Sequence, residues 1–220
     1  MSLPQSSLSP RAFVPALAAA VAAAVTLFAP QLLNDGDTWW HLAAGRWILD
    51  HGQVPHVDPF SYTMPGHPWQ AHEWLSEVLM ALAYRLAGWS GMIVLFAAAT
   101  GAAAWLVTRR LSRIMSGITL VLVVVLAMAC QGPGLLARPH ILVLPLLAGW
   151  MLEMLAARDE RRAPRLWMAL MIIPWANLHG SYVFGFFLTG VFGLAAPAEP
   201  CPAACRACRA AVRTWGRYAP

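Results

Sequence analysis

Long apolar stretches separated by short polar connections dominate the chain. An apolar helix of about 20 residues, rising about 1.5 Å per residue, crosses the hydrocarbon core of a bilayer. The first stretch, 12–33, exceeds the apolar core of a signal peptide, which is about 7–15 residues long, so we expect a retained span. Five later stretches have similar character: 91–107, 114–130, 141–156, 166–178 and 182–196. The pattern predicts an all-α fold, a polytopic transmembrane helix bundle of about six spans.

Residues 73–87 are also helical in pattern, but they carry Glu73, Glu77 and Arg85. Such a composition favours an amphipathic helix lying in the membrane interface. Arg concentrates in the cytoplasmic loops of membrane proteins. With a cytoplasmic N-terminus and 73–87 in the interface, 12 of the 15 Arg residues are inside, whereas counting 73–87 as a span leaves about 3 inside. The charge asymmetry therefore favours an interfacial helix.

The stretch 166–178 is short for a span, and Pro174 and Gly180 favour a break near its end. One long helix over 166–196 is the alternative. It would place the C-terminal tail outside and reduce the Arg advantage to 8 against 7.

Composition supports the membrane class. The chain is 59% hydrophobic and 11% charged, with a mean hydropathy of +0.57, whereas soluble domains carry about 25% charged residues. The net charge of +5 comes from Arg alone, because the sequence has no Lys. These Arg residues punctuate apolar runs instead of forming a basic patch, so nucleic acid is not an expected partner and membrane lipids are.

We expect one transmembrane module over residues 1–196, with a large first extracytoplasmic loop at 34–72 that carries interfacial helices. Residues 197–220 change to Ala/Pro/Cys/Arg sequence without periodicity, which indicates a disordered or truncated tail. Its three Cys residues lack a fourth ligand at a zinc-site spacing: Cys201, Cys205 and Cys208.

The first outer loop opens with the sequence N-D-G-D-T-W-W-H at 34–41. An ionised Asp near the bilayer centre costs about 2.5–3.5 kcal/mol, so this cluster should lie outside the hydrocarbon. Together with the next helix through Glu77, the loop holds six of the ten acidic residues and five of the seven His. Asp37 or Thr38 is expected to cap a helix running to Asp50. A polar loop with an aromatic belt is the simpler interpretation.

The predicted topology brings eight polar residues to the outer ends of spans: Asp35, Asp37, His41, Glu73, Arg138, His140, Asn177 and His179. A carboxylate can act as a general base on a hydroxyl, and paired carboxylates can hold Mg or Mn through oxygen ligands. The fork of an Arg guanidinium suits a phosphate. Such a set could accept the headgroup of a lipid-linked phosphosugar, or it could only anchor helix ends.

Five runs carry a family resemblance: D-G-D-T-W-W-H-L-A-A-G at 35–45, G-Q-V-P at 52–55, D-P-F-S-Y at 58–62, R-P-H at 138–140 and W-A-N-L-H-G at 175–180. They resemble segments of membrane-embedded GT-C glycosyltransferases, including the dolichyl-phosphate-mannose protein mannosyltransferase-like and aminoarabinose transferase-like proteins of bacteria. The resemblance covers roughly residues 12 to 196. Because family members run to several hundred residues, it implies that this chain corresponds to an N-terminal fragment.

The resemblance implies transfer of a sugar from a polyprenyl-phosphate donor to a lipid, glycan or protein acceptor on the periplasmic face of the bacterial inner membrane. It assigns the base to Asp37, with Asp35 beside it, and gives Glu73 the place of a further acidic residue. Arg138 would bind the donor phosphate, and the remaining expected substrate-binding residues are His41, His140, Asn177 and His179. A metal-dependent reaction would use Asp35 and Asp37 as ligands of Mg or Mn, but His140 stands where relatives often carry an acidic residue.

A non-catalytic or degenerate multi-span membrane protein is the alternative, either a transporter-like bundle or an inactive fragment. Transporters place polar groups near the bilayer midplane, often in repeated halves. Here the polar groups cluster at span ends and no internal repeat is evident, which favours the enzyme over the transporter.

Overall fold

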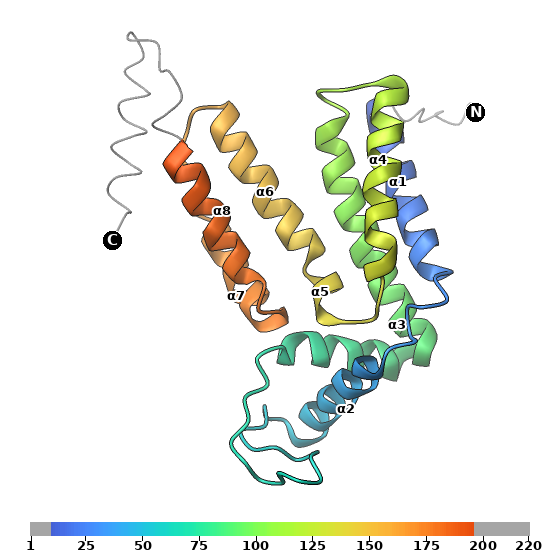
Figure 1. The fold of residues 1–220 in the computed structure, drawn as a ribbon, viewed down its shortest axis with the longest axis vertical. Coiled ribbons are helices and arrows are strands. Elements are labelled where there is room, and N and C mark those ends of the chain that lie inside the picture. Colours follow the sequence, from blue (N-terminus) through green and yellow to red (C-terminus); the bar gives the residue numbers. More distant parts are fainter. Residues whose placement is uncertain (1–9, 196–220) are drawn as a thin grey trace, which may run out of the picture.

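The computed structural model describes residues 10–195, which form helices joined by turns and loops (Figure 1). The longer helices are α1 (Pro10–Leu27), α2 (Gly36–His51), α3 (Trp74–Leu111), α4 (Gly117–Gln131), α6 (Leu144–Asp159), α7 (Met168–Leu178) and α8 (Tyr182–Ala195). Two short ones are η1 (Gly132–Gly134) and α5 (Pro139–Leu142). Within this described range the only extended pairing is an isolated bridge between Val57 and Pro68. The all-α prediction is confirmed.

Helix α3 is broken at Ala87 and Gly88, which have non-helical backbone angles. Gly88 has a φ of 58°, a conformation that glycine adopts at no steric cost. The part before the break lies across one end of the molecule, and the part after it runs lengthwise beside α1 (Figure 1). The break therefore separates a crossing helix from a lengthwise one.

The lengthwise helices run between two ends of the molecule, and different connecting segments lie at each end (Figure 1). The α3–α4 and α6–α7 connections lie at one end. Helix α2, the loop after it, the first part of α3, η1, α5 and the α7–α8 connection lie at the other, which we call the α2 end. Most of the residues expected to act together are in segments that meet at the α2 end.

Three expected boundaries differ from the structure. Helix α1 stops at Leu27 instead of continuing to residue 33, because Pro30 disfavours helical geometry at the residue before it. The cap of α2 is Asp35, not Asp37 or Thr38. The alternative of one helix over 166–196 is wrong, since His179 is extended (φ −167°, ψ 146°) between α7 and α8.

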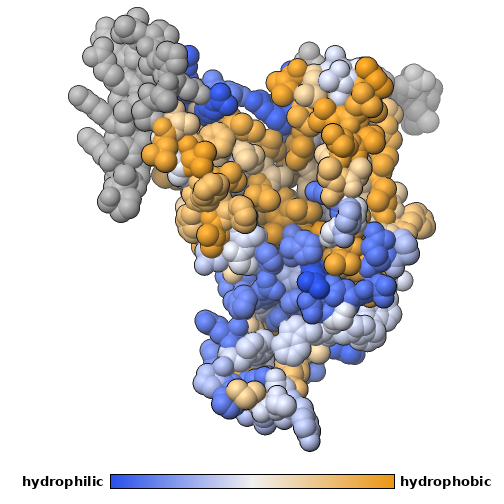
Figure 2. Space-filling view, in the orientation of Figure 1, coloured by the Kyte–Doolittle hydropathy of each residue, from blue (hydrophilic) through white to orange (hydrophobic). Residues whose placement is uncertain are grey.

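Among residues 10–195, two helices are long and apolar enough to cross a membrane, Trp74–Leu111 and Gly117–Gly134. Three shorter helices are apolar as well: Phe13–Leu27, Met168–Leu178 and Tyr182–Ala195. Helix α4 exposes apolar side chains along its length, with Leu120 its one buried residue. Figure 2 shows hydrophobic residues covering the lengthwise helices and hydrophilic residues covering the α2 end. These features point to membrane association, while the count of about six spans is not confirmed.

Two apolar clusters support the α2 end. One joins the chain after α1 to α3 and the segment before α6: Leu32, Met80, Met92, Phe96, Leu135, Ala137, Ile141 and Leu142. The other joins α6 to α7: Val143, Trp150, Met154, Met168, Trp175 and Leu178. Residues 138–140 are flanked by Ala137 and Ile141 of the first cluster, so both ends of that segment are fixed by packing. The predicted tail at 197–220 and its Cys residues lie outside the described residues.

Candidate functional site

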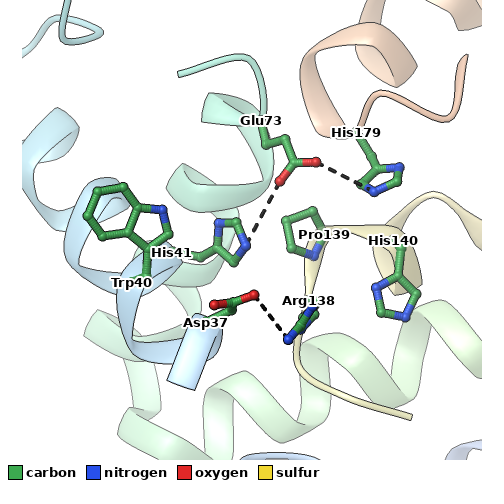
Figure 3. Close-up of a pocket in the computed structure, with 8 residues that line it drawn as sticks. All are labelled: Asp37, Trp40, His41, Glu73, Arg138, Pro139, His140 and His179. Carbon is green, nitrogen blue, oxygen red and sulfur yellow. Dashed lines mark ion pairs between the residues drawn. The ribbon is translucent and has the colours of Figure 1, made fainter. Parts of the chain in front are cut away.

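A polar cavity of about 360 Å³ opens at the α2 end of the molecule. Eight residues line it: Asp37, Trp40, His41, Glu73, Arg138, Pro139, His140 and His179 (Figure 3). They come from α2, the residue before α3, the α5 segment and the α7–α8 connection. Six of them were expected at this face from the sequence, whereas Trp40 and Pro139 were not singled out as site residues.

Arg138 is the centre of a three-residue ion cluster on one side of the cavity. Its Nη2 donates to Asp35 Oδ1 at 2.9 Å, and its Nε donates to Asp35 Oδ2. The same Nη2 lies 3.0 Å from Asp37 Oδ2. The Asp35 side chain is 11% exposed and that of Asp37 is 56% exposed. The less exposed Asp35 therefore bonds to the guanidinium on its side away from solvent, and the more exposed Asp37 contacts it on the open side of the cavity.

The hydrogen bond from Arg138 lowers the pKa of Asp35, although burial of the carboxyl opposes this shift. The same bond raises the pKa of Arg138. Both groups are therefore ionised at neutral pH. Asp35 also accepts from the backbone N–H of Asp37 at 3.1 Å, and this N-cap ties the ion cluster to the first turn of α2.

Backbone contacts fix the position of Arg138. The N–H of Ala137 donates to the carbonyl of Leu32 at 2.7 Å. The hydroxyl of the buried Thr38 donates to the carbonyl of Ala137 at 3.3 Å. Pro139 then begins α5, where its missing N–H costs nothing. The guanidinium consequently projects from a segment that is bonded to both the chain after α1 and helix α2.

Glu73 forms the opposite side of the cavity, between two imidazoles (Figure 3). Its Oε2 lies 3.9 Å from His41 Nε2, and its Oε1 lies 3.5 Å from His179 Nε2. Behind His41 stands Glu77, whose Oε1 lies 3.3 Å from His41 Nδ1. Glu77 is 2% exposed, and its second oxygen has no hydrogen-bond partner. Carboxylates and imidazoles thus alternate from the interior to the cavity.

His179 is oriented by the connection between α7 and α8. The backbone N–H of Ser181 donates to its Nδ1 at 3.1 Å, so in the neutral ring the proton is on Nε2, facing Glu73. Burial lowers the pKa of His179, and the Glu73 carboxylate opposes that shift. His179 is therefore a neutral donor toward Glu73 at neutral pH.

The remaining expected residues have other surroundings. Asn177 does not line the cavity; its Oδ1 accepts from Trp74 Nε1 at 2.6 Å, which ties the start of α3 to α7. His140 lines the cavity, and its Nε2 is 3.1 Å from the carbonyl of Gly134.

Sequence reasoning missed Glu77 as a site residue. It lies four positions after Glu73, the residue that caps α3, so the two acids are about one helical turn apart, and that spacing was the available signal.

Trp40 adds an aromatic wall to the cavity. Its ring makes edge-to-face contacts with Phe60 (centroids 4.9 Å apart) and with Trp69 (5.5 Å). The loop carrying these two rings is held by Asp58, whose carboxylate accepts from the backbone N–H groups of Phe60 and Ser61. The aromatic ring of Trp40 is thereby fixed beside the polar groups.

The donor set does not fit a divalent cation. Both oxygens of Asp35 accept from Arg138, and Asp37 faces the same guanidinium. A cation at these carboxylates would have to displace a positive group from its bidentate partner. Within residues 10–195, no group of three or more His, Cys, Asp or Glu side chains is arranged to hold a metal ion.

Comparison of the chain with protein-family models, with curated proteins and with solved structures finds no match. The family resemblance of the sequence stays a prediction.

Proposed function

We propose that this protein is a membrane-embedded glycosyltransferase that moves a sugar from a polyprenyl-phosphate donor to a lipid, glycan or protein hydroxyl. The observation that carries the proposal is the pairing of an exposed carboxylate, Asp37, with the guanidinium of Arg138 in a polar cavity beside apolar helices. A lipid-linked phosphosugar needs both surroundings, because its headgroup is polar and its chain is apolar.

In this proposal the protein crosses the bacterial inner membrane about six times, with its N-terminus in the cytoplasm and its cavity at the periplasmic face. The segments with clustered Arg support that orientation. Arg109, Arg110 and Arg113 lie at or after the end of α3, and the Arg residues of 158–165 lie at the end of α6 or in its connection to α7. Both groups are at the end away from the cavity (Figure 1). Arg in cytoplasmic loops is the pattern of inner-membrane proteins.

The ion cluster suggests how a phosphate would enter. Asp35 keeps its two hydrogen bonds to Arg138, and the donor phosphate takes the place of Asp37 at Nη2. The exchange leaves Arg138 charge-paired and frees the Asp37 carboxylate. Asp37 then accepts the proton of the acceptor hydroxyl.

The acceptor oxygen forms a bond to the anomeric carbon of the sugar while the bond from that carbon to the phosphate oxygen breaks. The electron pair of the broken bond stays on the leaving polyprenyl phosphate. Arg138 stabilises that charge at the position where it develops.

The test compares purified wild-type and Asp37→Asn protein in liposomes containing undecaprenyl-phosphate-linked mannose or glucose and a membrane lipid extract. Loss of a general base lowers rates by about 10²- to 10⁴-fold, so the variant should be nearly inactive in transferring radiolabelled sugar. Asp50→Asn is the matched control, since Asp50 pairs with Arg85 outside the cavity lining. A variant at position 37 that retained the wild-type rate would refute the assignment of the base.

One observation favours the non-catalytic alternative. Asp35, Asp37 and Arg138 already satisfy one another, as ion clusters with a purely structural role do. Absence of transfer from wild-type protein with both donors would support that alternative, whatever the variant does.

A further inference from the structure

The His41 side of the cavity is built differently from the Arg138 side. His41 Nε2 and Glu73 Oε2 both face the cavity and lie 3.9 Å apart, which is too far for a hydrogen bond. They are therefore not bonded to each other. A donor placed between them can reach both.

Glu77 determines whether His41 Nε2 is a hydrogen-bond donor or an acceptor toward the cavity. A carboxylate is an acceptor only, and Glu77 Oε1 is 3.3 Å from His41 Nδ1, so the ring proton belongs on Nδ1. The lone pair of a neutral His41 is then on Nε2, toward the cavity. Buried carboxylates fix the tautomer of an imidazole in this way in catalytic triads.

Glu73 has an imidazole beside its other oxygen. His179 Nε2 faces Glu73 Oε1 at 3.5 Å, which leaves Oε2 directed to the space in front of His41. The two free acceptors, an imidazole nitrogen and a carboxylate oxygen, therefore converge and each has a partner behind it. Two such acceptors match a ligand with two adjacent O–H donors, and they repel a second anion.

We infer that His41 and Glu73 form a sugar-hydroxyl site, in which Nε2 and Oε2 accept from neighbouring hydroxyls of a pyranose while Trp40 covers its apolar ring face. This inference rests on the proposed transfer function for its ligand class. Glu77 is a positioning residue in this site, because it acts through the tautomer of His41. The Arg138 side takes the phosphate, and the His41 side takes the sugar.

The first test measures the tautomer and needs no turnover. The full chain is labelled with ¹⁵N-histidine, reconstituted in liposomes at pH 8 and examined by solid-state NMR, with His41→Gln used to assign the signals. The expected His41 signals are a protonated Nδ1 and an unprotonated Nε2, because Glu77 Oε1 lies beside Nδ1. A proton on Nε2, either alone or on both nitrogens, would overturn the inference.

Glu77→Gln and Glu77→Asp separate positioning from folding. The Gln variant keeps the shape but lacks the charge, so His41 should change to a mixture of tautomers. The Asp variant restores the carboxylate and should restore the Nδ1 proton. A Gln variant with wild-type His41 signals would show that Glu77 does not set the tautomer.

The second test uses methyl α-D-mannopyranoside as the probe. Its hydroxyls should shift the His41 Nε2 signal, and Glu77→Gln should weaken binding by about three- to tenfold, as expected for one lost hydrogen bond. The fully O-methylated glycoside has the same ring without donors and should leave the signal unchanged. Equal shifts with both compounds, or none with either, would refute the sugar site. An active Asp37→Asn protein would instead refute the proposed base and leave these NMR outcomes intact.

Discussion

Asp35 and Asp37 are two positions apart in the sequence, but the fold gives them different surroundings. Asp35 caps α2 and is 11% exposed behind Arg138, while Asp37 is 56% exposed at the cavity. The sequence predicted that both belong to the site, but it could not predict which one holds the Arg. That difference depends on where residues 137–138 pack, a contact 103 positions distant in the chain. Similarly, Asn177 was expected to bind substrate; its amide oxygen accepts from Trp74, and the residue lies outside the cavity lining.

The half-buried imidazole of His179 makes stability depend on pH. Because burial lowers its pKa below the unfolded value, His179 contributes stability that is present above pH about 6.5 and is lost as pH falls through the folded pKa. We expect the unfolding temperature in detergent to fall between pH 7.5 and 5.5, and His179→Gln to reduce that fall.

His56→Gln is the control for this prediction, since His56 is exposed in the loop after α2 and does not line the cavity. Its pH dependence should match the wild type. An equal fall in wild-type and His179→Gln protein would show that other groups cause the acid sensitivity.

At the scale of elements, hydropathy located the helices better than it located their ends. The apolar run at 12–33 continues through residues that are not helical, because Pro30 restricts the backbone before it. The break within α3 depends on Gly88 at positive φ, a local feature that an apolar count does not include. Helix ends are set by single residues of this kind, while spans are set by averages over many residues.

Helices α2 and α3 touch closely at Gly45, and a side chain there should separate them. A Cβ at Gly45 would lie 1.9 Å from the carbonyl oxygen of Glu77, so Gly45→Ala has to push α2 away from α3. Overpacking costs about 1–3 kcal/mol, and here it also lengthens the contact between His41 and Glu77. We expect a lower unfolding temperature and altered His41 ¹⁵N signals.

Gly36→Ala is the matched change, because a Cβ at Gly36 meets no atom within 4 Å. It should change stability by no more than about 0.5 kcal/mol. If Gly45→Ala and Gly36→Ala had the same unfolding temperature and the same His41 ¹⁵N signals, the close packing of α2 on α3 would not determine the position of His41.

For the whole molecule, the charge pattern of the sequence and the fold agree: the expected site residues and the clustered Arg residues lie at opposite ends. The Arg count assigned sidedness without reference to the acidic and His residues, and the structure brings six of the eight expected site residues onto one cavity at the α2 end. The connections richest in Arg are at the other end (Figure 1). Hydropathy and charge can predict such a division because each loop carries its own signal. They cannot predict the cavity itself, since its walls come from packing between distant segments.

The proposed orientation predicts which loops an impermeant thiol reagent reaches in intact cells. Single Cys residues are placed at two exposed positions, Thr63 in the loop after α2 and Ser116 between α3 and α4, in a background with the native Cys replaced by Ser. Thr63→Cys should be labelled in intact cells, because the cavity end faces the periplasm. Ser116→Cys should be labelled only after the membrane is permeabilised. Labelling of Ser116→Cys alone would invert the orientation and place the cavity in the cytoplasm. Labelling of both in intact cells would mean that residues 89–111 do not cross the membrane. This outcome would contradict the proposal that the cavity binds a polyprenyl-phosphate donor at the membrane surface.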